Sequence, residues 1–318
     1  MIIWIAFTIL ILLLLALDLG VFNKVAHTPS AREALGWTAL WASVAILFAF
    51  VVHYLYRHQL VHNIDHLTPL GAVTKYLTGY LVEQSLSMDN IFVIALIFNY
   101  FHIPQVYQHR VFFWGIIGAI VFRGLMIGIG AVLIHRFSWI IYVFAAILLY
   151  SAWKMLKSDD TMRSLENNST IRFVRRFFPV VRHVNHGGFF VRRMGVWAVT
   201  PLLLALLVVE TTDVMFAFDS IPAIFGITTD PFLVFTSNIF AILGLRSLYF
   251  VLVSLLNRFR YLKPSLIFIL FFVGVKMLLS TYVELPEWLS LAVIAGALTF
   301  GILISFLKSR KEVPAPKS

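Results

Sequence analysis

The sequence predicts an all-α integral membrane protein with about nine transmembrane helices. The chain has 318 residues, of which 60% are hydrophobic and only 13% are charged, whereas a soluble domain has roughly 25% charged residues. No water-soluble fold of this length covers so much apolar surface with so few charges. The apolar residues also run in stretches of about twenty, rather than in the short alternating strands of a membrane barrel. These observations together predict a single transmembrane domain spanning 1–318.

Nine apolar stretches are each long enough to cross about 30 Å of hydrocarbon at about 1.5 Å per residue. Their approximate limits are 2–22, 34–56, 72–100, 111–135, 138–157, 195–226, 232–257, 264–282 and 287–307. The first stretch lacks the basic start and the small-residue cleavage site of a signal peptide. We therefore expect it to remain in the protein as a membrane span.

The distribution of lysine and arginine predicts the orientation. The connection 158–194 is the only long polar segment, and it is rich in arginine. If it is cytoplasmic, alternation of the spans places most other loop lysines and arginines on the same side, as the positive-inside rule requires. This arrangement puts the N-terminus outside and the C-terminus in the cytoplasm.

The net charge of +10 would suggest a nucleic-acid partner for a soluble protein. In a membrane protein it instead predicts basic cytoplasmic loops that face anionic lipid headgroups, with no nucleic-acid partner. Within 158–194, the stretch IRFVRRFFPVVRH predicts a basic amphipathic helix on the lipid surface. The alternative is that His183 and His186, beside a Gly-Gly turn, sense cytosolic metal or pH. No protein partner is indicated.

An internal repeat relates two triplets of spans, about 72–157 and about 195–282. Three pairs of short motifs recur in the same order and at nearly the same separation: Asp89-Asn-Ile-Phe with Asp213-Val-Met-Phe, Gly118–Arg123 with Ala241–Arg246, and Trp153–Leu156 with Val275–Leu278. Because each unit has three spans, the second copy is inverted relative to the first. Inverted 3+3 repeats are typical of secondary transporters, whose substrate site lies at the midplane.

Besides Glu287 at the first position of the last stretch, six acidic residues fall inside the predicted spans, where each costs about 2.5–3.5 kcal/mol at a helix centre. They are Asp18, Glu83, Asp89, Glu210, Asp213 and Asp219. One interpretation is that they form structural ion pairs with the embedded basic residues Arg123, Arg246, Lys154 and Lys276. Five of the six, however, are concentrated in the two repeat-related spans 72–100 and 195–226, which favours a functional site.

Helical geometry limits how these acids meet. On regular helices Glu210 and Asp213 share one face, whereas Asp219 points away from Glu210 and Asp89 points away from Glu83. They converge only if a segment unwinds or if two neighbouring helices surround them. Pro222 lacks an N–H group, so the sequence predicts unwinding at Asp219–Pro222 and free carbonyls there.

The donor atoms suggest the ligand. Carboxylates, the Asn90 amide and hydroxyls are hard oxygen donors that suit Mn²⁺, Mg²⁺ or Ca²⁺, and the absence of cysteine argues against Cu(I). Met88 and Met215 lie beside the acids in both copies and are either core packing or softer ligands that favour Mn²⁺. The accessory candidates are Asp18, Met88, Met215 and Ser220. We expect no cofactor: the ion would be the substrate, and protons would compete for the same carboxylates.

Several of these stretches resemble the TerC family of bacterial membrane proteins, in particular its Alx-type members. They are GYLVEQSLSMDNIFV, HGGFFVRR, FVGVKML and the segment that begins ETTDVMFAFDSIPAIF. The resemblance implies a bacterial inner-membrane protein of the lysine-exporter-like transporter class, with manganese export as its activity. It also implies a metal site at the same five acids, Glu83, Asp89, Glu210, Asp213 and Asp219.

A second function remains open. The family also carries tellurium-resistance and redox-modulator labels, so the alternative is a non-transporting membrane partner in a stress response that acts through the 158–194 loop. The chain has no cysteine, nucleophile elbow, P-loop or dinucleotide fingerprint. We therefore predict that it is not an enzyme.

Overall fold

The structure is a computed structural model that describes residues 2–17, 30–137, 139–157, 179–181, 187–193, 196–254, 262–279 and 286–309. Within these residues it has nine α-helices and one two-stranded hairpin. The helices are α1 (Ile2–Ala16), α2 (Ala31–Arg57), α3 (Pro69–Tyr100), α4 (Gln105–Arg136), α5 (Ile140–Lys157), α8 (Pro201–Phe225), α9 (Pro231–Ser254), α10 (Leu262–Leu279) and α11 (Glu287–Ser309).

Each predicted apolar stretch overlaps one of these helices. Seven helices of the described residues are long and apolar enough to cross a membrane, and α1 and α10 are not among the seven. Helix α1 has 15 residues, which is about 23 Å at 1.5 Å per residue. The structure thus supports a multi-pass helical membrane protein, with seven clear spans where the sequence predicts nine.

Capping residues explain why several helices begin earlier than their apolar stretches. The Ser30 side chain accepts a hydrogen bond from the backbone N–H of Glu33 at the start of α2. Thr68 accepts from the backbone N–H of Gly71 at the start of α3, where Pro69 occupies the first turn. Polar caps extend these helices beyond their apolar stretches.

The predicted span 195–226 is wrong at its start. Residues Val196–Val199 form strand β2, which pairs antiparallel with β1 (Phe190–Arg193), and α8 begins only at Pro201. Val180 also bridges Val199 in parallel, so the described end of the predicted amphipathic helix is extended instead. The rest of that stretch, with His183 and His186, lies outside the described residues.

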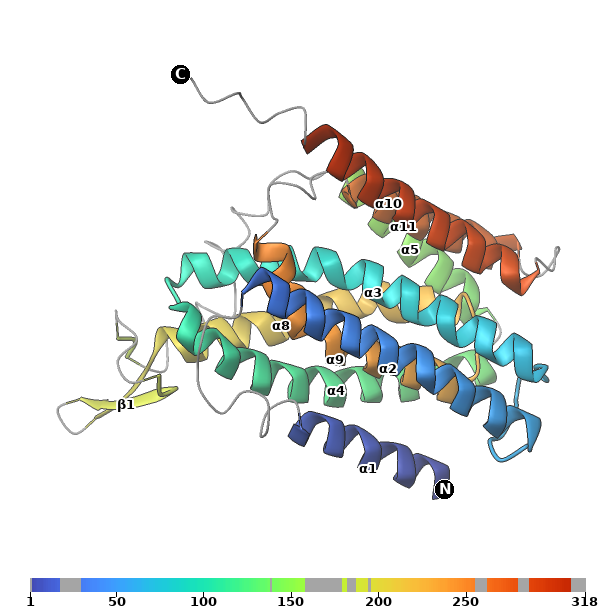
Figure 1. Ribbon diagram of the computed structural model, residues 1–318, viewed down its shortest axis with the longest axis horizontal. Coiled ribbons are helices and arrows are strands. Elements are labelled where there is room, and N and C mark those ends of the chain that lie inside the picture. The colour runs from blue at the N-terminus through green and yellow to red at the C-terminus, as the bar shows by residue number, and fades with distance from the viewer. Residues whose placement is uncertain are drawn as a thin grey trace.

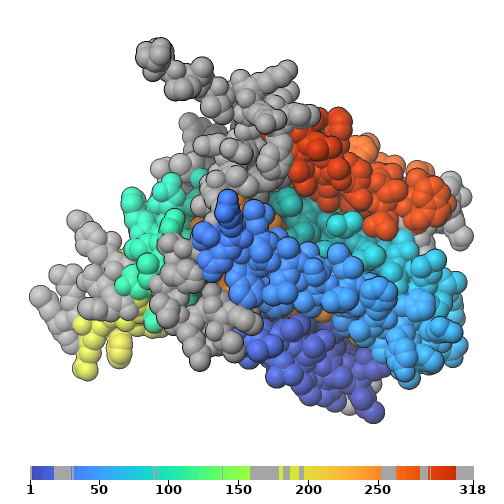
Figure 2. Space-filling model, viewed as in Figure 1, coloured from blue at the N-terminus to red at the C-terminus, as the bar shows by residue number. Residues whose placement is uncertain are grey.

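The helices form a central bundle with a second group beside it (Figure 1). Helix α9 is almost entirely buried and packs against α2, α3 and α4, while α4 also packs along α8. Helices α5, α10 and α11 lie together to one side, with α5 against α10 and α11 against α3. On the face shown in Figure 2, α3 lies between α2 and α11. Helix α1 contacts α9 through Trp4 and Phe232, whose rings meet edge-on.

Large apolar side chains cover the outward faces of the bundle. Phe50 of α2, Val121 and Val132 of α4, and Phe300 of α11 are each at least 63% exposed. Large apolar side chains exposed to this degree fit hydrocarbon rather than water. The chain is therefore an integral membrane protein with several membrane-crossing helices.

Candidate functional site

Arg123 is the centre of the buried polar structure. It lies on α4 with 1% of its surface exposed, and its Nη1 forms an ion pair with Glu83 Oε1 of α3. Its Nη2 lies 2.9 Å from Asp213 Oδ1, and its Nε lies 3.2 Å from Asp213 Oδ2, both on α8. Nη1 also donates to Asn238 Oδ1 of α9 at 3.4 Å. The side chain of Arg123 therefore links α4 to α3, α8 and α9.

This cluster keeps unused acceptors and donors. Glu83 and Asn238 are fully buried. Among the described residues, neither Glu83 Oε2 nor the Asn238 amide nitrogen has a hydrogen-bond partner. When ionised, two carboxylates outnumber the one guanidinium by a negative charge. In a low-dielectric interior this excess attracts a further cation or proton.

Glu210 provides a third carboxylate one turn before Asp213 on α8. Its carboxylate lies against the α4 backbone at Gly118, where an added Cβ would overlap it. Glu210 Oε2 is buried and has no partner in the part of the chain described. Glu210, Asp213 and Asn90 line a cavity of about 30 Å³ (the narrow cavity), and such a volume holds one or two water molecules or a cation of similar size.

Asp219 lies apart from this group. Its Oδ1 accepts a 2.5 Å hydrogen bond from Ser151 of α5, and it lines a separate cavity of about 400 Å³ (the wide cavity) together with Lys154 and Ser220. The predicted unwinding at Asp219–Pro222 is wrong, because α8 remains helical to Phe225. Pro222 removes only one backbone hydrogen bond near the helix end, where its own carbonyl still accepts from Gly226.

The other candidates are scattered. Met88 packs with apolar residues around Ile91, whereas Met215 lines the wide cavity and is 61% exposed. Of the basic residues, Arg246 is buried in α9 and Lys276 is half-buried in α10. Asp89 is helical within α3, but its side chain lies outside the described part, as does all of Asp18.

The structure thus brings together Glu83, Asp213 and Arg123, with Glu210 and Asn90 at the adjoining narrow cavity. No three His, Cys, Asp or Glu side chains among the described residues are placed to hold a metal ion together. Two members of the site escaped the sequence reasoning. Asn238 is a polar residue in an apolar span, a signal that was available, whereas the role of Gly118 depends on helix packing.

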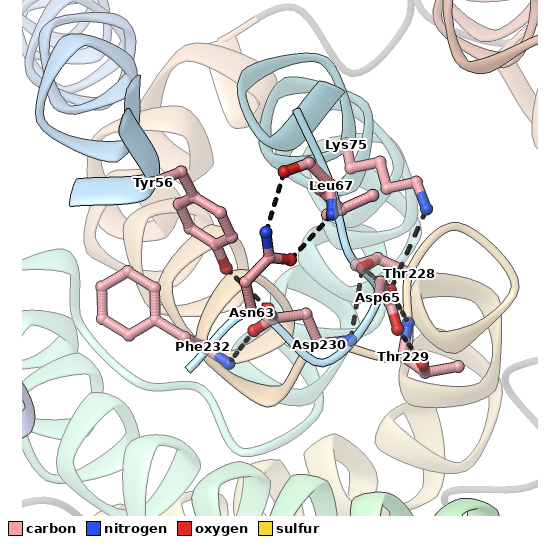
Figure 3. Close-up of polar contacts among 9 residues, drawn as sticks. All are labelled: Tyr56, Asn63, Asp65, Leu67, Lys75, Thr228, Thr229, Asp230 and Phe232. Atoms are coloured by element: carbon pink, nitrogen blue, oxygen red, sulfur yellow. Dashed lines mark hydrogen bonds and ion pairs between the residues drawn. The ribbon is translucent and has the colours of Figure 1, made fainter. Parts of the chain in front are cut away.

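A second polar cluster lies at one end of the bundle, where the α2–α3 loop meets the α8–α9 turn (Figure 3). Asp65 accepts from the side chains of Thr228 and Thr229 and from the Thr229 backbone N–H, and Lys75 Nζ lies 3.9 Å away. Asp230 accepts a 2.7 Å hydrogen bond from the Tyr56 hydroxyl. Sequence reasoning missed both aspartates because it ranked only acids inside spans.

The pKa values of the two aspartates in this cluster are shifted in opposite directions. Burial raises the pKa of Asp230, and hydrogen bonds from Tyr56 and Phe232 only partly oppose this rise. Burial acts in the same direction on Asp65, but there the hydrogen bonds from Thr229 and Thr228 and the charge of Lys75 outweigh it. The pKa of Asp65 is therefore held below its usual value.

The lowered pKa of Asp65 predicts a pH-dependent contribution to stability. A carboxyl with a depressed folded-state pKa stabilises the protein above the pKa of the unfolded chain, and this contribution disappears as the pH falls through the folded value. Thermal unfolding in detergent should show Asp65→Asn less stable than wild type at neutral pH, with the gap closing below about pH 4. A constant gap across this range would contradict the assignment.

Comparisons with known proteins agree with one another. The sequence model of the Integral membrane protein TerC family matches residues 69–313. An uncharacterized membrane protein of Myxococcus xanthus is 44% identical and covers 99% of this chain and 96% of its own. The "Putative membrane-bound redox modulator Alx" of Escherichia coli (strain K12) is 39% identical, and the match covers 95% of this chain and 93% of the relative. No solved structure matches.

Proposed function

Because the chain belongs to the TerC family of integral membrane proteins, we propose that it is a secondary transporter that exports a divalent metal cation, with Mn²⁺ as the first candidate, from the cytoplasm across the bacterial inner membrane. The observation that carries the proposal is an incompletely neutralised acid group: Glu83 and Asp213 share the single guanidinium of Arg123, and Glu210 lies with Asp213 at the adjoining narrow cavity. Ionisable residues inside a membrane protein are costly and usually mark ion pathways.

Arg123 gives the acid group a way to exchange cations. Its guanidinium neutralises Glu83 and Asp213 and occupies both oxygens of Asp213. A metal ion that enters the narrow cavity beside Glu210 and Asp213 would compete with the guanidinium for the same oxygens. Protons would compete as well, which provides a route for coupling metal export to proton entry.

Helix packing supports an exchange mechanism of the inverted-repeat type. Helix α3 packs along α9 just as α4 packs along α8, and α5 packs on α10. If α3, α4 and α5 are exchanged with α8, α9 and α10 in that order, the α3–α9 contact becomes the α8–α4 contact. The α5–α10 contact becomes itself, as an inverted repeat requires. Transporters of this construction alternate access by moving one part against the other around a fixed site.

The names of the relatives offer a different function. The Alx proteins are named for redox modulation, but the present chain has no cysteine and therefore no thiol–disulfide couple of its own. A stress-response role through the 158–194 loop remains the alternative. It predicts that the acids around Arg123 are dispensable for that role.

Transport by purified protein in liposomes tests the proposal. An imposed proton gradient should drive Mn²⁺ movement that is reported by a metal-quenched dye. Glu210→Gln keeps the shape of the side chain but removes a charged oxygen, and we expect the initial rate to fall about tenfold or more, since about 1.4 kcal/mol of lost binding corresponds to a factor of ten.

The control is Thr211→Ala, the exposed neighbour on the same helix, which should transport at the wild-type rate. Competition by Mg²⁺ and Ca²⁺ in the same assay ranks the substrates. If wild-type protein moves no divalent cation, or if Glu210→Gln transports as fast as wild type, the proposal is wrong.

A further inference from the structure

Two separate cavities lie within the bundle and share part of their walls. The narrow cavity is bounded by α3, α4, α8 and α9 and contains Glu210 and Asp213. The wide cavity is bounded by α3, α5, α8 and α10 and contains Asp219 and Ser220. Asn90 and Phe216 line both. These two residues therefore stand where one cavity ends and the other begins.

The order of the lining residues shows that the cavities are stacked along the bundle axis. On α8, the residues that line the narrow cavity fall within 209–216, and those that line the wide cavity fall within 215–220. On α3, which runs in the opposite direction (Figure 1), the wide cavity takes Leu86 and Asn90, and the narrow cavity takes Asn90, Ile94 and Phe98. Both helices place the boundary at the same level, that of Asn90 and Phe216.

Both cavities contain a carboxylate, Asp213 in one and Asp219 in the other, whereas the boundary between them contains an aromatic ring. Asp213 and Asp219 are about 9 Å apart along the α8 axis at 1.5 Å per residue. The wide cavity also holds Ser220, a residue that is 2% exposed and whose hydroxyl has no hydrogen-bond partner among the described residues. The phenyl ring of Phe216 offers no oxygen ligand between these polar groups.

We propose that Phe216, which shares the boundary with Asn90, is an apolar partition that separates two water-accessible chambers of one ion path. Apolar constrictions gate such paths by excluding water. Asn90 is the polar edge of the partition, and the carboxylates of Asp213 and Asp219 lie on its two sides. The proposal rests on the proposed function in one respect, namely that a cation is the species that crosses, but the partition has a test of its own.

The absence of cysteine makes that test direct, because single thiols need no prior removal of native ones. Thr212→Cys introduces a thiol at the narrow cavity and Ser220→Cys introduces one at the wide cavity. Ag⁺, a thiol-reactive cation no larger than a water molecule, is applied to one side of sealed vesicles at a time, and the thiols that it leaves free are measured after denaturation. We expect the two thiols to react from opposite sides.

Adding Phe216→Ala should open the partition and make at least one thiol reactive from both sides. Phe216→Leu keeps an apolar plug and should keep the one-sided labelling. The matched control is Phe218→Ala, which removes an aromatic ring that is 57% exposed and lines neither cavity. If Phe216→Ala leaves the sidedness unchanged while the protein remains monodisperse, or if both thiols already react from the same side, the partition is refuted.

Transport provides the second readout. With a Mn²⁺ gradient and no proton gradient, Phe216→Ala should increase passive Mn²⁺ flux several-fold over wild type, while Phe218→Ala should not. Wild-type protein that moves no cation would overturn the proposed function. In that case the change in labelling caused by Phe216→Ala would still support the partition, so the two failures are distinguishable.

Discussion

Replacing Arg123 with methionine is expected to destabilise the central bundle by about 3–5 kcal/mol, the range for removing one partner of a buried ion pair. Methionine fills much of the same space, so the loss is electrostatic. Glu83 is fully buried and would have no cation against it, and Asp213 would lose both contacts at 2.9 Å and 3.2 Å. Thermal unfolding of detergent-purified protein measures the effect.

Two companion variants separate charge from packing. Arg136→Met removes an exposed arginine from the end of the same helix and should unfold at the wild-type temperature. Adding Glu83→Gln and Asp213→Asn to Arg123→Met removes the unpaired charges and should recover much of the stability, because contacting residues are not additive. A single variant Arg123→Met as stable as wild type would mean that the ion pairs do not hold the bundle together.

Asp230→Ala is expected to produce the second large loss, about 2–4 kcal/mol, from two separate causes. Asp230 Oδ1 accepts the backbone N–H of Phe232 at 2.9 Å and so caps the start of α9. Its Oδ2 accepts from the buried hydroxyl of Tyr56, which would be left without an acceptor. Unfolding temperatures in detergent again provide the measurement.

The two causes are separable with Tyr56→Phe. This variant removes the hydroxyl but leaves the cap, so it should cost less than Asp230→Ala. In the double variant no hydroxyl remains to be left unpaired, and the total loss should be smaller than the sum of the single losses. Strict additivity would show that the bond between Tyr56 and Asp230 contributes nothing.

Elements governed by local physics were predictable from the sequence. Apolar stretches became helices because a backbone surrounded by apolar groups must satisfy its own hydrogen bonds. The acids of the stretches 72–100 and 195–226 stood out as unusual from their cost alone. The start of α8 was missed, because Val196–Trp197 read as apolar membrane residues and their pairing with β1 depends on another segment.

The membrane class, the helical stretches and the residues that carry unusual chemistry are determined by the sequence itself, because hydrophobic length and the cost of buried charge act on each residue separately. Only the tertiary structure decides which of those residues meet. It joins Arg123 to Glu83 and Asp213, places Glu210 in the space that Gly118 leaves, and keeps Asp219 in another cavity. Such distances depend on how helices rotate and slide against one another, and the spacing of residues along one helix does not contain that information.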